Sequence, residues 1–210
     1  MSPMQQVAKL VPQETVFFLC DVQTRFREAI YGFDALILTA NKMLKVAKNM
    51  DIPVVVTEQN PKGLGPTVPE IDVASLGSLH VATIDKTLFS MVTPEVKELL
   101  KARPNLKSVV LFGIESHVCV LQSALDLVEA GYNVHVIADG VSSCNKEEVP
   151  YALARIRQSG GYITTSESAA FQLQRDSHST TFKPFSKIIK DEKDNTKQAV
   201  QVLLQHRSVL

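Results

Sequence analysis

The sequence has few cysteines, no long apolar run and no excess of charge of either sign. Its three cysteines are an odd number and lie far apart, so they form no disulfide framework and indicate a reducing compartment. No apolar run approaches the roughly 18 residues of a membrane-spanning helix, so we expect no membrane partner. The 22 basic and 22 acidic residues leave a formal net charge of zero, which argues against binding of nucleic acid. Residues 1–10 are too short and too polar for a secretory signal, and together these features favour a cytoplasmic protein.

What is present is the composition of an ordinary globular domain, with 45% hydrophobic and 21% charged residues. A length of 210 residues is compatible with one large domain whose core needs no disulfide or metal to stabilise it. We therefore expect a single domain over residues 1–210. The regular alternation of strand-like and helix-like segments covers about residues 13–176, which we expect to form the core of the domain, and residues 177–210 are left as a C-terminal extension.

Segments with the pattern of strands alternate with segments with the pattern of helices. The predicted strands are 15–20, 54–57, 80–84, 109–112, 133–138 and 162–164. The predicted helices are 34–50 with Asp34 as N-cap, 94–103, 116–130 with Ser116 as N-cap, 146–159, and one that begins at 166. This alternation is typical of a parallel sheet covered by helices on both faces. With right-handed crossovers it predicts a doubly wound, Rossmann-like α/β sheet of six strands in the order 3-2-1-4-5-6.

Cys119 occupies a position that suits a reactive thiol. The apolar run 109–112 reads as a buried strand, and the helix predicted from Ser116 carries Cys119 in its first turn. Unpaired N–H groups and the positive end of the helix dipole favour a thiolate there. Ligands of open α/β sheets bind at this carboxyl edge. The alternative is that Cys119 is a small buried hydrophobic residue, as most free cysteines are.

Asp21 and Lys86 also lie at or just beyond the ends of predicted strands. In the predicted order the first and fourth strands are neighbours at the switch point, so Asp21 and Cys119 would face one crevice. A carboxylate can take the proton of a thiol, and a nearby ammonium stabilises developing negative charge. The alternatives are that Asp21 caps a helix near Thr24 and that Lys86 is solvated. We favour the interpretation in which Asp21, Lys86 and Cys119 act together.

Three motifs in this order resemble the isochorismatase-like cysteine hydrolases. They are Phe18-Leu-Cys-Asp-Val-Gln23, Lys86-Thr-Leu-Phe-Ser90 and Gly113-Ile-Glu-Ser-His-Val-Cys-Val120. The resemblance runs from about Thr15 to Ser168, and the segment 57–70 is similar to the isochorismatase domain-containing proteins of eukaryotes. It implies that Asp21 is a general base, that Lys86 is its charged partner, and that Cys119 is a nucleophile forming a thioester with an acyl substrate.

The same resemblance implies an oxyanion hole next to the nucleophile. Family members have a cis peptide bond two residues after the glycine that corresponds to Gly113, which here is the Ile114–Glu115 bond. The bond would aim the N–H groups of Glu115 and Cys119 at one point. Two such donors can stabilise the oxyanion of an acyl-transfer transition state.

The substrate pocket is predicted from position along the chain, and no cofactor is expected. The candidate lining residues are Gln23, Phe26, Gln59, Ser116 and His117, although His117 fits a solvated loop equally well. Nicotinamidases of this superfamily hold a metal with an Asp-x-His pair after the second strand, whereas this chain has Glu-Gln-Asn at 58–60. The remaining histidines are too scattered for a zinc signature, so we expect no catalytic metal.

Two further functions stay open beside a small-molecule amide or ester hydrolase. The first is hydrolysis of isochorismate, a vinyl ether, with Asp21 as general acid and no covalent step. The second is a binding or scaffold protein without turnover, against which the intact Asp21, Lys86 and Cys119 argue.

The C-terminal extension carries the predictions about assembly. Residues 182–190 fit one helix, and the charged residues 190–196 are expected to be mobile. Residues 199–204 are apolar enough for a docked or subunit-bridging helix. With the family resemblance, this segment favours a homo-oligomer, either a dimer or a tetramer.

Overall fold

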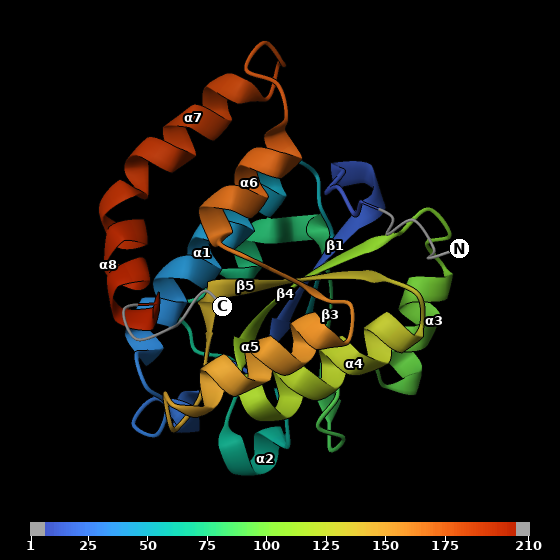
Figure 1. The fold of residues 1–210 in the computed structure, drawn as a ribbon, viewed down its shortest axis with the longest axis vertical. Helices are drawn as coiled ribbons and strands as arrows, with labels where there is room; N and C mark the ends of the chain where they lie inside the picture. The colour runs from blue at the N-terminus through green and yellow to red at the C-terminus, as the bar shows by residue number, and fades with distance from the viewer. Residues whose placement is uncertain (1–6, 205–210) are drawn as a thin grey trace.

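The computed structural model describes residues 7–204, and a six-stranded parallel sheet forms its centre (Figure 1). The strands are β1 (Thr15–Cys20), β2 (Val54–Gln59), β3 (His80–Lys86), β4 (Ser108–Ile114), β5 (Asn133–Ser142) and β6 (Tyr162–Thr164). Their spatial order is β3-β2-β1-β4-β5-β6, which confirms the predicted doubly wound sheet.

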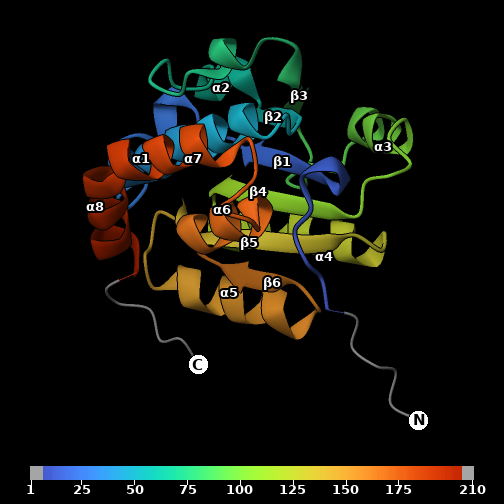
Figure 2. The same cartoon turned by 90° about the horizontal axis from the view of Figure 1, so that it is seen from above.

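Helices cover both faces of this sheet (Figure 2). The α-helices are α1 (Phe33–Asn49), α2 (Pro61–Leu64), α3 (Pro94–Lys101), α4 (Leu121–Glu129), α5 (Glu148–Gln158), α6 (Ser166–Gln174), α7 (Phe182–Asp191) and α8 (Lys193–Leu204). Short 3-10 turns are η1 (Pro12–Glu14), η2 (Thr24–Phe26) and η3 (Val73–Leu79), and η4 (Ser116–Val120) is a π-helical turn. No helix within residues 7–204 combines the length and the apolar character needed to cross a membrane.

The side-chain alternation of β1 divides the core into two layers. Phe17 and Leu19 point to the layer built with α1, α6, α7 and α8, and Phe18 and Cys20 point to the layer built with α3, α4 and α5. Because Cys119 also packs in the second layer, strand β1 and turn η4 present their cysteines to the same side of the sheet.

The register of the central strands brings their ends together. Cys20 lies opposite Thr57 of β2 and opposite Gly113 of β4, while Lys86 lies opposite Gln59. Gly113 has a φ of 126°, and a Cβ built on it would lie 2.2 Å from the carbonyl oxygen of Cys20. Only glycine therefore allows β4 to pass this close to the end of β1.

Asp34 and Ser116 are not the N-caps that the sequence predicts. Helix α1 begins at Phe33 behind Gly32, which has a φ of 63°, and Asp34 lies in the first turn in an ion pair with Arg27. Ser116 is the first residue of η4, and its hydroxyl donates to the carbonyl of Ser142 at 3.0 Å and accepts no capping hydrogen bond from an amide of the turn. Strand β4 also continues past Gly113, and β5 continues to Ser142, beyond the predicted ends.

The expectation of a mobile segment at 190–196 is also wrong. These residues end α7 and begin α8, and Glu192 between the two helices is buried. Its carboxylate lies 2.5 Å from Nζ of Lys45, and Nζ of Lys42 lies 2.9 Å from Oγ1 of Thr196. Helix α8 docks on α1 with Leu203 buried, and two lysines of α1 contact Glu192, just before α8, and Thr196 in its first turn.

Candidate active site

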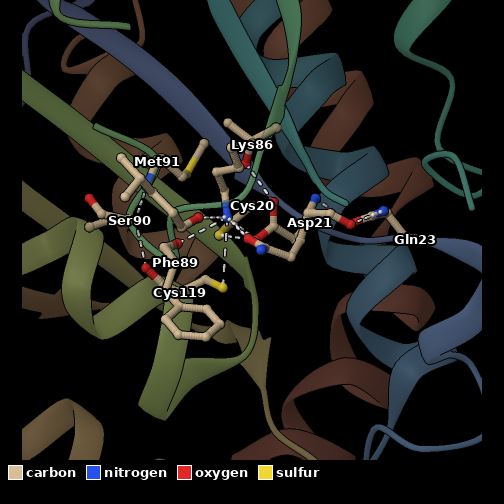
Figure 3. A network of polar contacts seen from close by, with 12 residues as sticks. Cys20, Asp21, Gln23, Lys86, Phe89, Ser90, Met91 and Cys119 are labelled. Atoms are coloured by element: carbon tan, nitrogen blue, oxygen red, sulfur yellow. Dashed lines mark hydrogen bonds and ion pairs between the residues drawn. The ribbon is translucent and has the colours of Figure 1, made fainter. Parts of the chain in front are cut away.

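Asp21, Lys86 and Cys119 come from three separate strand ends and meet in one network (Figure 3). Nζ of Lys86 lies 2.7 Å from Oδ2 of Asp21 and 3.8 Å from Sγ of Cys119. The side chains of Lys86 and Asp21 are 0% and 1% exposed, so the ion pair is almost fully removed from water. Lys86 is therefore not a solvated surface lysine.

The ammonium group of Lys86 is held in place by several acceptors. Besides the Asp21 carboxylate, it contacts Oε1 of Gln59 at 2.7 Å and the carbonyl oxygens of Leu88 and Phe89 at 3.1 and 2.9 Å. An ammonium has three protons, so the four oxygen acceptors share three donors and together fix the position of the nitrogen. The result is a positive charge with one defined location beside the Cys119 sulfur.

Asp21 has a backbone and a side chain that are both tightly constrained. Its φ is 52°, in the left-handed region that non-glycine residues rarely adopt and that often occurs at functional sites. The hydroxyl of Thr57 donates to Oδ1 at 2.7 Å, while Oδ2 accepts from Lys86. Asp21 does not cap a helix near Thr24, because the N-cap position of η2 is Gln23 and has no side-chain cap bond.

Cys20 is a member of the network that the sequence analysis missed. Its buried thiol donates to Oδ2 of Asp21 at 3.6 Å. Burial raises the pKa of Cys20 well above its ordinary value, and its hydrogen bond with Cys119 and the Asp21 carboxylate raise that pKa further. Cys20 is thus a protonated donor next to the carboxylate. The only signal in the sequence was its place directly before Asp21 at a strand end.

Cys119 lies in η4 with 7% of its surface exposed. It packs in the apolar layer under α4, as expected of a buried hydrophobic residue, while its sulfur contacts Lys86. The carbonyl oxygen of Cys119 accepts from the hydroxyl of Ser123 at 2.6 Å, which ties η4 to α4. The peptide bond between Ile114 and Glu115, which connects β4 to η4, is cis.

Of the five predicted pocket residues, Gln59 is the one whose side chain is hydrogen-bonded to a side chain of the Asp21–Lys86–Cys119 network within residues 7–204: it accepts from Nζ of Lys86. Gln23 is buried and lies behind it: its amide donates to the carbonyls of Gln59 and Gly65 at 2.9 and 2.7 Å, and its oxygen accepts from Gln59 N. Gln23 therefore positions Gln59.

The other three predicted pocket residues have different surroundings. Phe26 is half-buried and packs against the apolar layer that contains α1. Ser116 is buried, and its hydroxyl is bonded to Ser142. Nδ1 of His117 lies 3.0 Å from Oγ of Ser143. None of the three has a recorded hydrogen bond to the network within the described residues, and their role in binding stays a prediction.

The segment where nicotinamidases hold their metal serves another purpose here. Oε1 of Glu58 accepts from the amide and the hydroxyl of Thr67 at 2.6 and 2.7 Å, and Gln59 is bonded to Lys86. These groups are therefore used to fix the loop that follows β2. The absence of a catalytic metal stays a prediction.

Comparison with known proteins agrees with this arrangement. Residues 15–168, which include all three side chains of the network, match the Isochorismatase domain. The chain belongs to the isochorismatase family. The family resemblance predicted from the three motifs is thereby confirmed, and isochorismatase-like proteins are generally hydrolases.

Three proteins similar to this chain come from different eukaryotes. Isochorismatase domain-containing protein 2 of Xenopus laevis is 47% identical over 90% of this chain and 90% of its own. The secreted isochorismatase effector Isc1 of Phytophthora sojae is 46% identical over 90% of this chain and 91% of its own. The structure of MAR1 ribonuclease from Caenorhabditis elegans superposes with a TM-score of 0.79 at 39% identity, covering 87% of this chain and 93% of that one. Because one isochorismatase relative is described as secreted, the cytoplasmic location stays a prediction.

Proposed function

We propose that this chain is a small-molecule hydrolase that cleaves an amide or ester through a covalent thioester on Cys119. The observation that carries the proposal is the position of the Lys86 ammonium, which bridges the Asp21 carboxylate and the Cys119 sulfur. A thiol, a base and a fixed positive charge are the parts that nucleophilic catalysis by cysteine requires.

In the first step, the Cys119 proton goes to Asp21 and the sulfur attacks the substrate carbonyl carbon. The positive charge of Lys86 stabilises the thiolate that forms beside it. When the tetrahedral intermediate collapses, Asp21 returns the proton to the leaving amine or alcohol, and the acyl group stays on sulfur. A water molecule, deprotonated by Asp21, then attacks the thioester and releases the acid, and the proton returns to Cys119.

The N–H groups of Glu115 and Cys119 are the donors we assign to the carbonyl oxygen of the substrate. Glu115 is the single residue between β4 and η4, and Cys119, the nucleophile itself, lies within η4. One such donor contributes on the order of 3 kcal/mol to the transition state. The carbonyl oxygens of Leu88 and Phe89 contact Lys86, and the two residues are 55% and 52% exposed, so their apolar side chains favour a substrate with an apolar acyl group.

Hydrolysis of isochorismate by Asp21 as a general acid is less well supported. Paired with the Lys86 ammonium, Asp21 is a carboxylate, and this form accepts a proton and does not donate one. The relative described as a ribonuclease raises RNA as a substrate, but the zero net charge of this chain offers little attraction for phosphates. Small-molecule amides and esters therefore remain the first substrates to test.

The test compares the wild-type chain with Cys119→Ser, which is nearly isosteric, on a panel of small amides and esters, on isochorismate and on RNA. We expect wild-type turnover of at least one amide or ester, loss of that turnover in the variant, and an acyl mass shift on the Cys119 peptide. Peptide mapping also reports acylation of Cys144, an exposed thiol that serves as the internal control. Turnover that survives Cys119→Ser, or cleavage of isochorismate or RNA alone, would show that the proposal is wrong.

A further inference from the structure

A second group of metal-ligating side chains lies outside the Asp21–Lys86–Cys119 network. Glu115, His117 and Cys144 each offer one ligand atom, and these three atoms all lie within 4.8 Å of one another. Within the described part of the chain, this is the one cluster of three or more histidine, cysteine or acidic side chains close enough to hold an ion. We propose that Glu115, His117 and Cys144 form a binding site for a divalent transition-metal ion of the zinc type.

The ligand types suit such an ion. Zinc binds thiolate sulfur at about 2.3 Å, imidazole nitrogen at about 2.0–2.1 Å and carboxylate oxygen at about 2.0–2.2 Å, in tetrahedral geometry. Two ligands of one tetrahedral ion then lie about 3.3–3.6 Å apart. Atoms within 4.8 Å of one another need to move by about an ångström, which rotation of the exposed Cys144 side chain and the half-exposed Glu115 allows. Three protein ligands leave the fourth position for water.

The two segments that carry these ligands are already joined by hydrogen bonds. Glu115 and His117 belong to the connection from β4 into η4, and Cys144 follows the end of β5. The amide N–H of Cys144 donates to Oε2 of Glu115 at 2.8 Å, and Nδ1 of His117 lies 3.0 Å from Oγ of Ser143. Contacts of this kind orient metal ligands before the ion binds. The site is therefore largely assembled by the fold.

The charges at the cluster also favour a cation. The Glu115 carboxylate lies beside Cys144 and accepts a hydrogen bond from its amide N–H at 2.8 Å. A divalent ion bound here would balance the negative charges of one carboxylate and one thiolate with its two positive charges.

Cobalt reports thiolate ligation through a near-ultraviolet charge-transfer band, so the test uses Co²⁺ and Zn²⁺ alone. The full-length Cys119→Ser variant, which removes a competing thiol, is first treated with a chelator. We expect it to bind one Co²⁺ per chain with this band, which one equivalent of Zn²⁺ removes. Adding Cys144→Ser should abolish the band, and adding His117→Gln should weaken binding at least tenfold, with circular dichroism unchanged.

The alkylation of Cys144 gives a second readout that does not depend on the spectrum. Iodoacetamide should label Cys144 in the chelator-treated protein, and one equivalent of Zn²⁺ should slow that labelling at least tenfold. His117→Gln should remove the protection while leaving Cys144 itself in place. A charge-transfer band that survives Cys144→Ser, or labelling of Cys144 that Zn²⁺ does not slow, would overturn the proposal.

Discussion

Replacing Lys86 with methionine tests whether the buried ion pair has the energetics that its geometry implies. Met keeps the length of the side chain but removes the ammonium, so the Asp21 carboxylate, 1% exposed, is left without its counter-charge. Removal of one partner of a buried pair costs about 3–5 kcal/mol. Because Thr57 and Cys20 still donate to Asp21, we expect the lower end of this range, about 3 kcal/mol.

The assay is urea unfolding at pH 7, with thermal unfolding as a second measurement. For a chain of this size, a loss of about 3 kcal/mol lowers Tm by about 6–12 °C. Asp21→Asn should also destabilise, because it leaves the Lys86 ammonium buried and unpaired. The double variant should lose less than the sum of the two single variants, because it leaves no unpaired charge. Lys101→Met is the control, since Lys101 is paired with Glu98 on the surface.

The result that would refute this reasoning is a Lys86→Met protein as stable as Lys101→Met. Additive effects of the two single substitutions in the double variant would do the same. Either result would mean that water reaches Asp21 and Lys86, contrary to their burial in the structure. The loss of the ammonium should in addition slow alkylation of Cys119, which contacts it at 3.8 Å.

Three more predictions concern single residues. Burial lowers the pKa of His135 to about 4, whereas the pKa of an unfolded histidine is about 6.5, so between pH 6.5 and pH 4 the unfolded chain binds more protons than the folded one. The free energy of unfolding should therefore fall by up to about 3 kcal/mol as the pH drops through this window. Urea titration should show a smaller fall in His135→Gln. Gly113→Ala should lower the free energy of unfolding by about 2–6 kcal/mol, because of backbone strain and a clash with Cys20. The control is Gly131→Ala: Gly131 also has a positive φ, but no atom lies within 4 Å of a Cβ built on it, so the loss in the same urea titration should be smaller. Iodoacetamide should alkylate Cys119 faster than a free cysteine at pH 7, as peptide mapping over time will show; equal rates would contradict the activated thiol.

Local patterns were enough to predict the sheet. Hydrophobic runs of three to six residues, separated by amphipathic segments, predicted six strands and their order, because a parallel sheet with right-handed crossovers allows few topologies. The same order predicted that Asp21 and Cys119 would face one crevice. Boundaries were less accurate: Asp34 and Ser116 have the chemistry of N-caps, but an ion pair with Arg27 and a hydrogen bond to Ser142 use them otherwise.

The sequence alone determined the fold class, the three chemical groups of the candidate site and the family motifs, because these depend on residue type and on spacing along one strand or helix. Only the tertiary structure decided that Cys20 and Thr57 touch Asp21, that Gln23 supports the loop of Gln59, and that α8 is docked on α1. It also decided the cluster of Glu115 with Cys144, 29 residues apart. Apart from the contact between the neighbours Cys20 and Asp21, these contacts join segments distant in the chain, and their geometry follows from strand register and packing, which local pattern does not encode.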